Sequence, residues 1–114
     1  MTEGKVLKGD KSATKLGFPT ANITNKDNVL PGIYAGHVIL AGETFDAVLY
    51  VGKKRKEILE AHILDFKKNI YGKTIQVEVI EKIRDDENIS DVGLLKEKIE
   101  KDTMDAWAIL FGHK

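Results

Sequence analysis

The strongest constraint on the fold is a series of four closely spaced segments in which apolar and polar residues alternate. β-Branched and aromatic residues recur in these segments with the two-residue period of a β-strand. The segments cover residues 33–40, 43–51, 57–64 and 73–83. The connections between them are too short for helical crossovers, so the four strands are expected to pair antiparallel.

Beyond residue 83 the pattern changes to that of a helix. Apolar residues follow at helical spacing, namely Val92, Leu95, Ile99, Ala106 and Leu110,. Ser90 is the expected N-cap, and Asp102-Thr103 is a possible break between two helices,. With two short strands at 5–9 and 21–24, the sequence predicts a mainly β fold, in which about six antiparallel strands curl into a small barrel packed by a C-terminal helix.

Length and composition limit the possible partners. The 114 residues predict a single domain over 1–114, and the 18 basic and 18 acidic side chains balance, so no bulk charge favours nucleic acid or a membrane surface,. Cysteine is absent, which excludes disulfides, thiolate metal sites and a cysteine nucleophile,. No signal-peptide core or membrane-length apolar run is found, so a cytoplasmic monomer is expected,.

The stretch "KLGFPTANI" presents two neutral oxygen ligands, Thr20 and Asn22. Because they stand two residues apart, an extended backbone directs both side chains to the same face. Mg²⁺ held by so few neutral protein oxygens normally takes its anionic ligands from substrate phosphates, so the pattern indicates a metal–nucleotide complex. The alternative is a turn and strand start in which Asn22 bonds to its own backbone.

A carboxylate in the segment 57–64 is the second candidate. Leu59 and Ala61 are expected on one face of the strand, and Glu60 and His62 on the other,. A partly buried carboxylate can act as the general base that phosphoryl transfer requires. The alternative is that Glu60 is a solvent-facing residue paired with a nearby lysine, and His62 is expected to be a packed or half-exposed strand residue.

Five stretches, taken in order, resemble the riboflavin kinase (flavokinase) family. They are "LGFPTAN", "LPGIYAG", "EAHILDF", "IYGKTIQVEV", and "IR" followed by "LLKEKIEKD", and together they reach from about Val6 to Asp102. The resemblance implies a six-stranded antiparallel Greek-key β-barrel with a C-terminal α-helix. It also implies transfer of the γ-phosphoryl group of ATP to the ribityl 5′-hydroxyl of riboflavin, giving FMN and ADP with Mg²⁺ as cofactor.

The resemblance assigns roles to individual residues. Thr20 and Asn22 match the family's Pro-Thr-Ala-Asn motif, whose Thr and Asn contact the metal and the phosphates, and Glu60 matches the base for the hydroxyl. The loop that covers the nucleotide phosphates in relatives corresponds here to a stretch with Gly9, Lys15 and Gly17. Arg84 matches an arginine in the segment that borders the flavin site.

Two departures from the family pattern affect these expectations. A loop that follows Gly52 in many relatives is shortened here to a basic run, Lys53, Lys54, Arg55 and Lys56, which either supplies compensating charge or is a solvated turn,. The acidic-aromatic motif after Arg84 has lost its aromatic residue. The alternative functions are therefore a flavin- or nucleotide-binding barrel with weak or no turnover, and a structural barrel without a small ligand.

Two further expectations concern regions outside the motifs. Trp107 and Phe111 in the terminal helix either line a flavin pocket or serve core packing or an oligomer contact,. Many bacterial relatives also have an N-terminal adenylyltransferase module that makes FAD. The sequence shows no such module, so the expected product is FMN.

Overall fold

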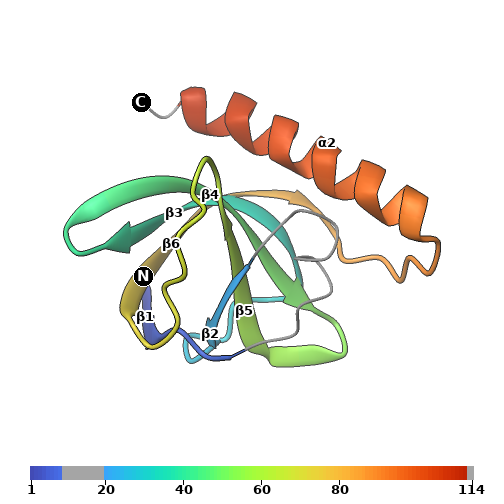
Figure 1. The fold of residues 1–114 in the computed structure, drawn as a ribbon. Coiled ribbons are helices and arrows are strands. Elements are labelled where there is room, and N and C mark those ends of the chain that lie inside the picture. Colours follow the sequence, from blue (N-terminus) through green and yellow to red (C-terminus); the bar gives the residue numbers. More distant parts are fainter. Residues whose placement is uncertain (9–19, 113–114) are drawn as a thin grey trace.

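A computed structural model describes residues 1–8 and 20–112, which form one six-stranded sheet and one described helix (Figure 1). The elements are β1 (Thr2–Lys5), β2 (Ala21–Thr24), β3 (Gly32–Leu40), β4 (Glu43–Gly52), β5 (Arg55–Ile63), β6 (Thr74–Arg84) and α2 (Val92–Phe111). All neighbouring strands pair antiparallel in the order β1-β6-β3-β4-β5-β2. Within this order β6 returns beside β3 after the β3-β4-β5 meander, which is a Greek key. The predicted fold class is confirmed.

The two edges of the sheet are joined by the residues that follow β1. The Val6 N–H donates to the Lys73 carbonyl at 2.8 Å, and the Leu7 N–H donates to the Asn22 carbonyl at 2.7 Å. These bonds connect the β6 side of the sheet to β2, so the barrel is nearly closed. Closure of this kind satisfies edge groups that would otherwise be open to pairing with another chain.

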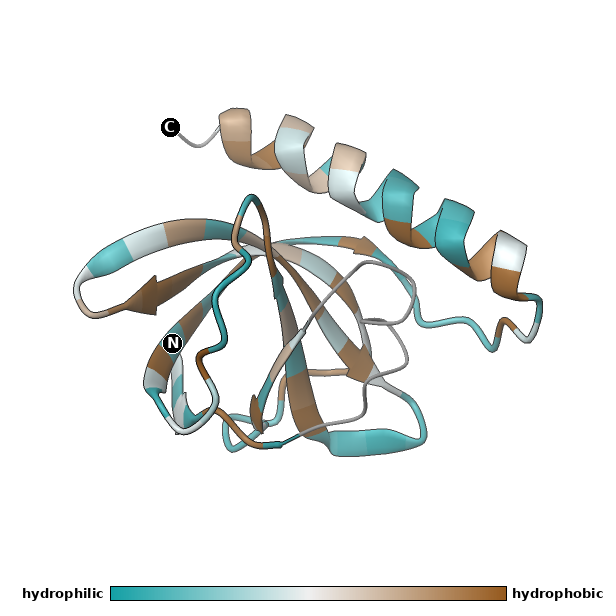
Figure 2. Ribbon diagram, viewed as in Figure 1, coloured by the Kyte–Doolittle hydropathy of each residue, from teal (hydrophilic) through white to brown (hydrophobic). Residues whose placement is uncertain are grey.

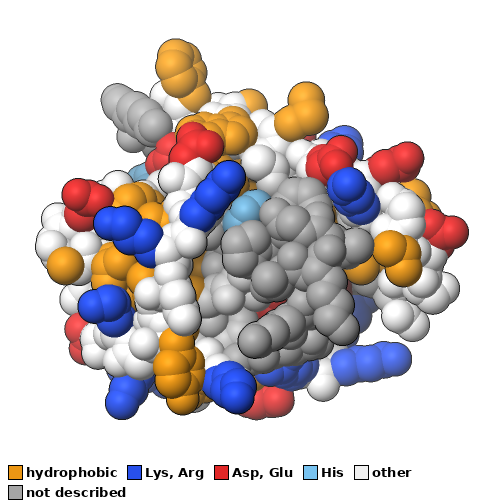
Figure 3. Space-filling model, viewed as in Figure 1, with side chains coloured by type: hydrophobic (Ala, Val, Ile, Leu, Met, Phe, Trp, Pro, Cys, Tyr) orange, Lys and Arg blue, Asp and Glu red, His pale blue; other side chains and the backbone are white. Residues whose placement is uncertain are grey.

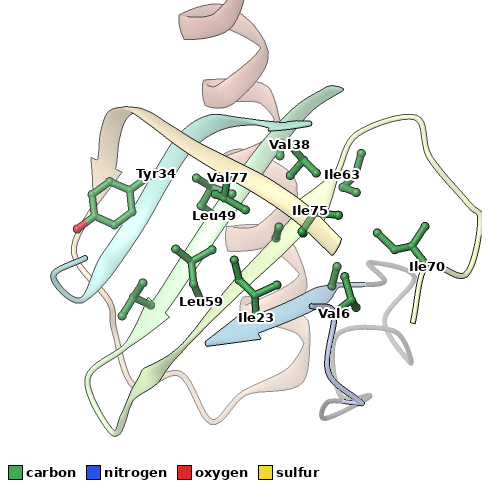
Figure 4. Packing of buried hydrophobic residues seen from close by; sticks show 14 residues of the cluster. Val6, Ile23, Tyr34, Val38, Leu49, Leu59, Ile63, Ile70, Ile75 and Val77 are labelled. Atoms are coloured by element: carbon green, nitrogen blue, oxygen red, sulfur yellow. The ribbon is translucent and has the colours of Figure 1, made fainter. Parts of the chain in front are cut away.

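The barrel interior is filled by aliphatic side chains, as the alternation in the sequence predicts. Leu59 and Ala61 on β5 are fully buried, and Ile23 and Leu49 meet them from β2 and β4. Figure 4 shows Ile23, Leu49 and Leu59 converging between the strands. The opposite residues of the same strands therefore lie on the outer surface of the barrel, where the candidate site is found.

Helix α2 covers part of that outer surface. Ile33, Ala35 and Val48 on β3 and β4 form a second buried cluster with Ala106 and Leu110 of α2. The apolar side of α2 faces the barrel in Figure 2. The N-terminal half of the helix lies beside the ends of β4 and β6, where Ile99, Gly52 and Arg84 line a common pocket.

The structure corrects two expectations about the helix. Asp91, not Ser90, is the N-cap, and its side chain accepts a hydrogen bond from the Leu94 N–H at 2.8 Å. The helix also continues without a break through 102–103. The Thr103 hydroxyl donates back to the Ile99 carbonyl at 3.1 Å, which satisfies the hydroxyl without ending the helix,.

The first strand is also placed differently. The sequence predicts a strand over 5–9, whereas β1 is Thr2–Lys5. Val6 and Leu7, which suggested the middle of a strand, lie where the chain crosses from β6 to β2. An apolar residue is required there because Val6 packs in the core, with 5% of its surface exposed.

Candidate active site

A row of polar side chains crosses the outer face of β2, β5 and β4. Asn22 on β2 is the direct partner of Glu60 on β5, and Glu60 is the partner of Tyr50 on β4. Side chains that lie opposite each other in an antiparallel sheet project from the same face. The pairing register therefore brings together two of the residues selected from the sequence, Asn22 and Glu60, although they are far apart in the chain.

Glu60 lines a pocket of about 250 Å³ between this row and the N-terminal half of α2. The polar part of its wall includes Thr20, Tyr50, Arg55, His62 and Arg84. Much of the remaining wall is aliphatic, with Ile33, Ile58 and Ile99 from three different elements. An apolar pocket with a few polar groups at one side suits a ligand that has a flat apolar part and a polar chain.

Asn22 is buried, yet its side chain has no hydrogen-bond partner among the described residues. The side chain belongs to a residue with 2% exposure, and both Oδ1 and Nδ2 are unpaired. The structure thus contradicts the alternative in which Asn22 bonds to its own backbone. Leaving a buried amide unpaired is costly, and such groups are rare in native proteins. A carbonyl oxygen in this position, with the Thr20 hydroxyl two residues away, fits a magnesium ion that also binds phosphate oxygens.

Glu60 is only partly exposed and is paired with an arginine. Its side chain is 29% exposed, and its Oε1 lies 3.5 Å from the Arg55 Nη1. The sequence-based alternative is matched in part, because Glu60 faces outward and is paired with a basic side chain, but this partner is an arginine and Glu60 is partly buried. The carboxylate form, which makes this ion pair, is the form able to accept a proton.

Tyr50 places a second unpaired polar atom at the site. Its hydroxyl is buried and has no hydrogen-bond partner in the described part of the chain. Burial raises the pKa of Tyr50 well above its usual range, and the nearby Asp102 carboxylate raises it further. The phenol therefore stays neutral at physiological pH. No pattern in the sequence singles out this residue.

Arg84 lies at the pocket, as the resemblance implies, and is held by α2. Its Nε and Nη2 donate to the two carboxylate oxygens of Asp102 at 2.8 and 2.9 Å. This hydrogen bonding raises the pKa of Arg84. Asp102 is 1% exposed, and the sequence analysis took it for a helix break. The missed signal is a lone carboxylate on the apolar face formed by Ile99 and Ala106, which predicts a buried basic partner.

Two further contacts hold the segments around the pocket together. The Lys53 N–H in the β4–β5 turn donates to the Asp86 carboxylate at 3.0 Å. Glu87, in the segment between β6 and α2, is 3.3 Å from the Lys98 Nζ of the helix. The β4–β5 turn, the 85–91 segment and α2 are thus linked on one side of the pocket.

Among the described candidates, the two aromatic residues of the terminal helix are not brought to the site, whereas Gly9, Lys15 and Gly17 lie outside the described residues. Trp107 and Phe111 are 38% and 80% exposed, and neither lines the pocket. Both aromatic residues therefore lie at the exposed surface, not in the pocket.

In residues 1–8 and 20–112, no group of three or more His, Cys, Asp or Glu side chains is arranged to hold a metal ion. The same residues include no helix with the length and apolarity to span a membrane. Basic and acidic side chains are interspersed on the face drawn in Figure 3.

Comparison with known proteins identifies the family. The family model Flavokinase, described as riboflavin kinase, matches residues 1–110. The bifunctional riboflavin kinase/FMN adenylyltransferase of Haemophilus influenzae is 40% identical over 113 residues, which cover 92% of this chain and 37% of that protein. The protein of the same description from Bacillus subtilis is 34% identical, covering 91% of this chain and 36% of its own length. The chain thus spans little more than a third of these relatives.

Solved structures show the same fold. The riboflavin kinase of Trypanosoma brucei matches with a TM-score of 0.66 and 25% identity, covering 95% of this chain and 77% of that one. A Streptococcus pneumoniae structure described as a macrolide-efflux protein matches with a TM-score of 0.80 and 28% identity, covering 90% of this chain and 36% of the other. With a family model that spans nearly its whole length, the chain belongs to the flavokinase (riboflavin kinase) family.

Proposed function

We propose that this chain is a riboflavin kinase, which transfers the γ-phosphoryl group of ATP to the ribityl 5′-hydroxyl of riboflavin and releases FMN and ADP. The observation that supports this most directly is the register of β2 and β5, in which Asn22 lies opposite Glu60. Thr20 and Glu60 line one pocket, so a metal–nucleotide ligand group and a carboxylate base are adjacent. The proposal covers the kinase step alone.

In this proposal Glu60 is the general base. Its carboxylate accepts the proton of the 5′-hydroxyl as the hydroxyl oxygen attacks the γ-phosphorus. The aliphatic wall that includes Ile33 and Ile99 holds the isoalloxazine ring, and Arg84 borders the same space. Binding the ring fixes the ribityl chain in the pocket, and such positioning is a large part of catalysis in phosphoryl transfer.

Thr20 and Asn22 are the proposed magnesium ligands. The unpaired Oδ1 of the buried Asn22 supports this assignment, because a bound cation would supply its missing partner,. When bound, Mg²⁺ supplies positive charge that offsets the charge of the phosphates. By resemblance, Gly9, Lys15 and Gly17 belong to the loop over those phosphates.

The test is an assay for FMN with riboflavin, ATP and Mg²⁺. The Glu60→Gln variant is expected to lose about 10²-fold or more in kcat, because that is the usual worth of a general base, while nucleotide binding is retained. Glu57→Gln is the matched control, since Glu57 is an exposed glutamate on the same strand. Thr20→Ala is expected to raise the Mg²⁺ concentration needed for half-maximal turnover.

Other outcomes of this assay would support different functions. A wild-type protein that forms no FMN but quenches flavin fluorescence saturably would be a flavin-binding barrel, for which the shortened β4–β5 turn is the motivating feature. Normal turnover by Glu60→Gln would remove the base assignment. An unchanged Mg²⁺ requirement in Thr20→Ala would count against the metal role of that hydroxyl.

A further inference from the structure

The basic run at the β4–β5 turn is not uniform. Lys53, Lys54 and Lys56 are exposed, whereas Arg55 is half-buried and lines the pocket. Arg55 is also the residue of the run whose side chain reaches Glu60, with 3.5 Å between Nη1 and Oε1. We propose that Arg55 is a catalytic residue that binds the phosphoryl group during its transfer. The inference rests on the proposed kinase function.

The backbone around Arg55 is fixed. Arg55 begins β5 and pairs with Gly52 at the end of β4. The adjacent turn is tied to the segment after β6 by the hydrogen bond from the Lys53 N–H to Asp86. The guanidinium is therefore presented from a restrained hairpin, which lowers the entropic cost of placing it over a substrate.

The two arginines of the chain differ in how firmly their guanidinium groups are already bound to carboxylates. Arg84 uses Nε and Nη2 to bind Asp102, whose carboxylate is buried and holds the guanidinium in place. Among the described residues, Arg55 makes one ion pair, at the longer distance of 3.5 Å, and its side chain is 41% exposed. A partly exposed pair at 3.5 Å is weak, so Arg55 can exchange this partner for a phosphate oxygen. Arginine is well suited to binding phosphate with two parallel N–H groups.

The chemistry of the transfer explains why the partner changes. The 5′-hydroxyl oxygen forms a bond to the γ-phosphorus, and the bond from that phosphorus to the bridging oxygen breaks, so that ADP leaves with the electron pair. The hydroxyl proton moves to the Glu60 carboxylate. A protonated Glu60 no longer attracts the guanidinium, and Arg55 then binds the oxygens of the transferred group. An interaction that strengthens between substrate and transition state raises kcat, not only substrate affinity.

The role can be tested by binding alone, without ATP or Mg²⁺. FMN differs from riboflavin by the phosphate, so fluorescence-quenching titrations with both flavins isolate the phosphate contact. Arg55→Ala is expected to weaken FMN binding about tenfold or more, because a charge-assisted hydrogen bond is lost. Riboflavin affinity is expected to stay within about twofold. Lys54→Ala is the matched control, which removes the same charge from an exposed position of the same turn, and it is expected to leave both affinities unchanged.

Two further variants sharpen the result. Arg55→Lys keeps the charge without the planar guanidinium, and it is expected to recover part of the FMN affinity. Glu60→Gln removes the competing carboxylate, so FMN should bind more tightly than to the wild type. That gain should vanish in the double variant Glu60→Gln/Arg55→Ala. In turnover, Arg55→Ala is expected to lower kcat by about tenfold or more with little change in KM for riboflavin.

The outcomes separate this inference from the proposed function. If Arg55→Ala weakens both flavins equally, or neither, Arg55 does not bind the phosphate and the inference is overturned, while FMN formation by the wild type still supports the kinase. If the wild type forms no FMN but binds FMN more tightly than riboflavin through Arg55, turnover is excluded and the phosphate contact stands. If the wild type binds neither flavin, both proposals are wrong.

Discussion

The inner and outer faces of the barrel wall differ in how they treat polar atoms. On the inner face of β2, Ile23 is fully buried among aliphatic side chains. On the outer face of the same strand, Asn22 is almost as completely buried but has no hydrogen-bond partner among the described residues. Tyr50 and the Arg84–Asp102 pair extend this polar character beneath α2. The inner face is thus explained by packing alone, whereas the outer face retains polar groups at an energetic cost, as expected where a ligand binds.

Adjacent substitutions on β2 give the largest expected contrast. Ile23→Ala should lower the free energy of unfolding by about 2–5 kcal/mol, because it leaves a cavity in the barrel interior. Asn22→Leu should raise it by about 1 kcal/mol, because the change removes an unpaired buried amide at similar volume. The same Asn22→Leu variant should lose Mg²⁺-dependent FMN formation. Urea unfolding and the FMN assay measure the two effects.

The difference between the inner and outer faces predicts that Ile23→Ala and Asn22→Leu change the free energy of unfolding in opposite directions. Ile23→Val is the conservative control and should cost only about 0.5–1.5 kcal/mol. If Asn22→Leu destabilises the protein as much as Ile23→Ala does, the amide has a structural role, and the outer face would not differ in principle from the interior.

The Arg84–Asp102 pair gives the next effect, and it should be asymmetric. Arg84→Met leaves an uncompensated carboxylate that is 1% exposed, which should cost about 3 kcal/mol,. Asp102→Leu leaves a guanidinium whose side chain is 20% exposed and lies 3.9 Å from Glu87, so the charge can be rehydrated and the cost should be about 1 kcal/mol,.

Combining both changes in one chain tests whether the pair stabilises the fold or serves the site. Apolar replacement of a buried ion pair is often neutral, so the double variant should unfold within about 1 kcal/mol of the wild type. It should nevertheless bind riboflavin more weakly, because Arg84 borders the pocket. A double variant that is as unstable as Arg84→Met, measured in the same urea titrations, would show that the pair is needed for folding.

The strands and the positions of their core residues could be predicted because the alternation of apolar and polar residues within each strand determines both. Alternation alone places Leu59 and Ala61 inside the barrel and Glu60 outside it,. The two-residue turn at Ala41 and Gly42, with φ of +51° and +80°, fits the predicted antiparallel pairing of the segments 33–40 and 43–51,. Residue spacing suggested the proposed roles of Thr20, Asn22 and Glu60, and the resemblance made those roles specific.

The contacts around the site that the sequence did not reveal depend on how the elements cross and turn in space. Asp102 meets Arg84 only because α2 crosses the sheet beside the end of β6, and no period in either segment encodes that crossing. Arg55 stands in a run of four basic residues that are equivalent by local pattern, and the hairpin geometry alone turns this one towards Glu60. Val6 was assigned to a strand because apolar character does not distinguish a strand centre from a crossing point.

The smallest expected effect concerns His62, a titratable side chain on the outer face of β5. Burial lowers the pKa of His62 from its ordinary value of 6.5, so the neutral form is favoured in the folded state. Below pH 6.5 the unfolded chain takes up a proton that the folded chain does not, and stability therefore falls as the pH decreases, until the pH reaches the lowered folded pKa,. The slope for one such group is at most about 1.4 kcal/mol per pH unit.

The His62→Gln variant should lack this contribution. The difference in unfolding free energy between wild type and variant should therefore stay constant above pH 6.5, and it should shrink or reverse on acidification below pH 6.5. Parallel stability curves for the two proteins would mean that His62 titrates alike in both states, and that this part of the outer face is as open to water as an ordinary surface.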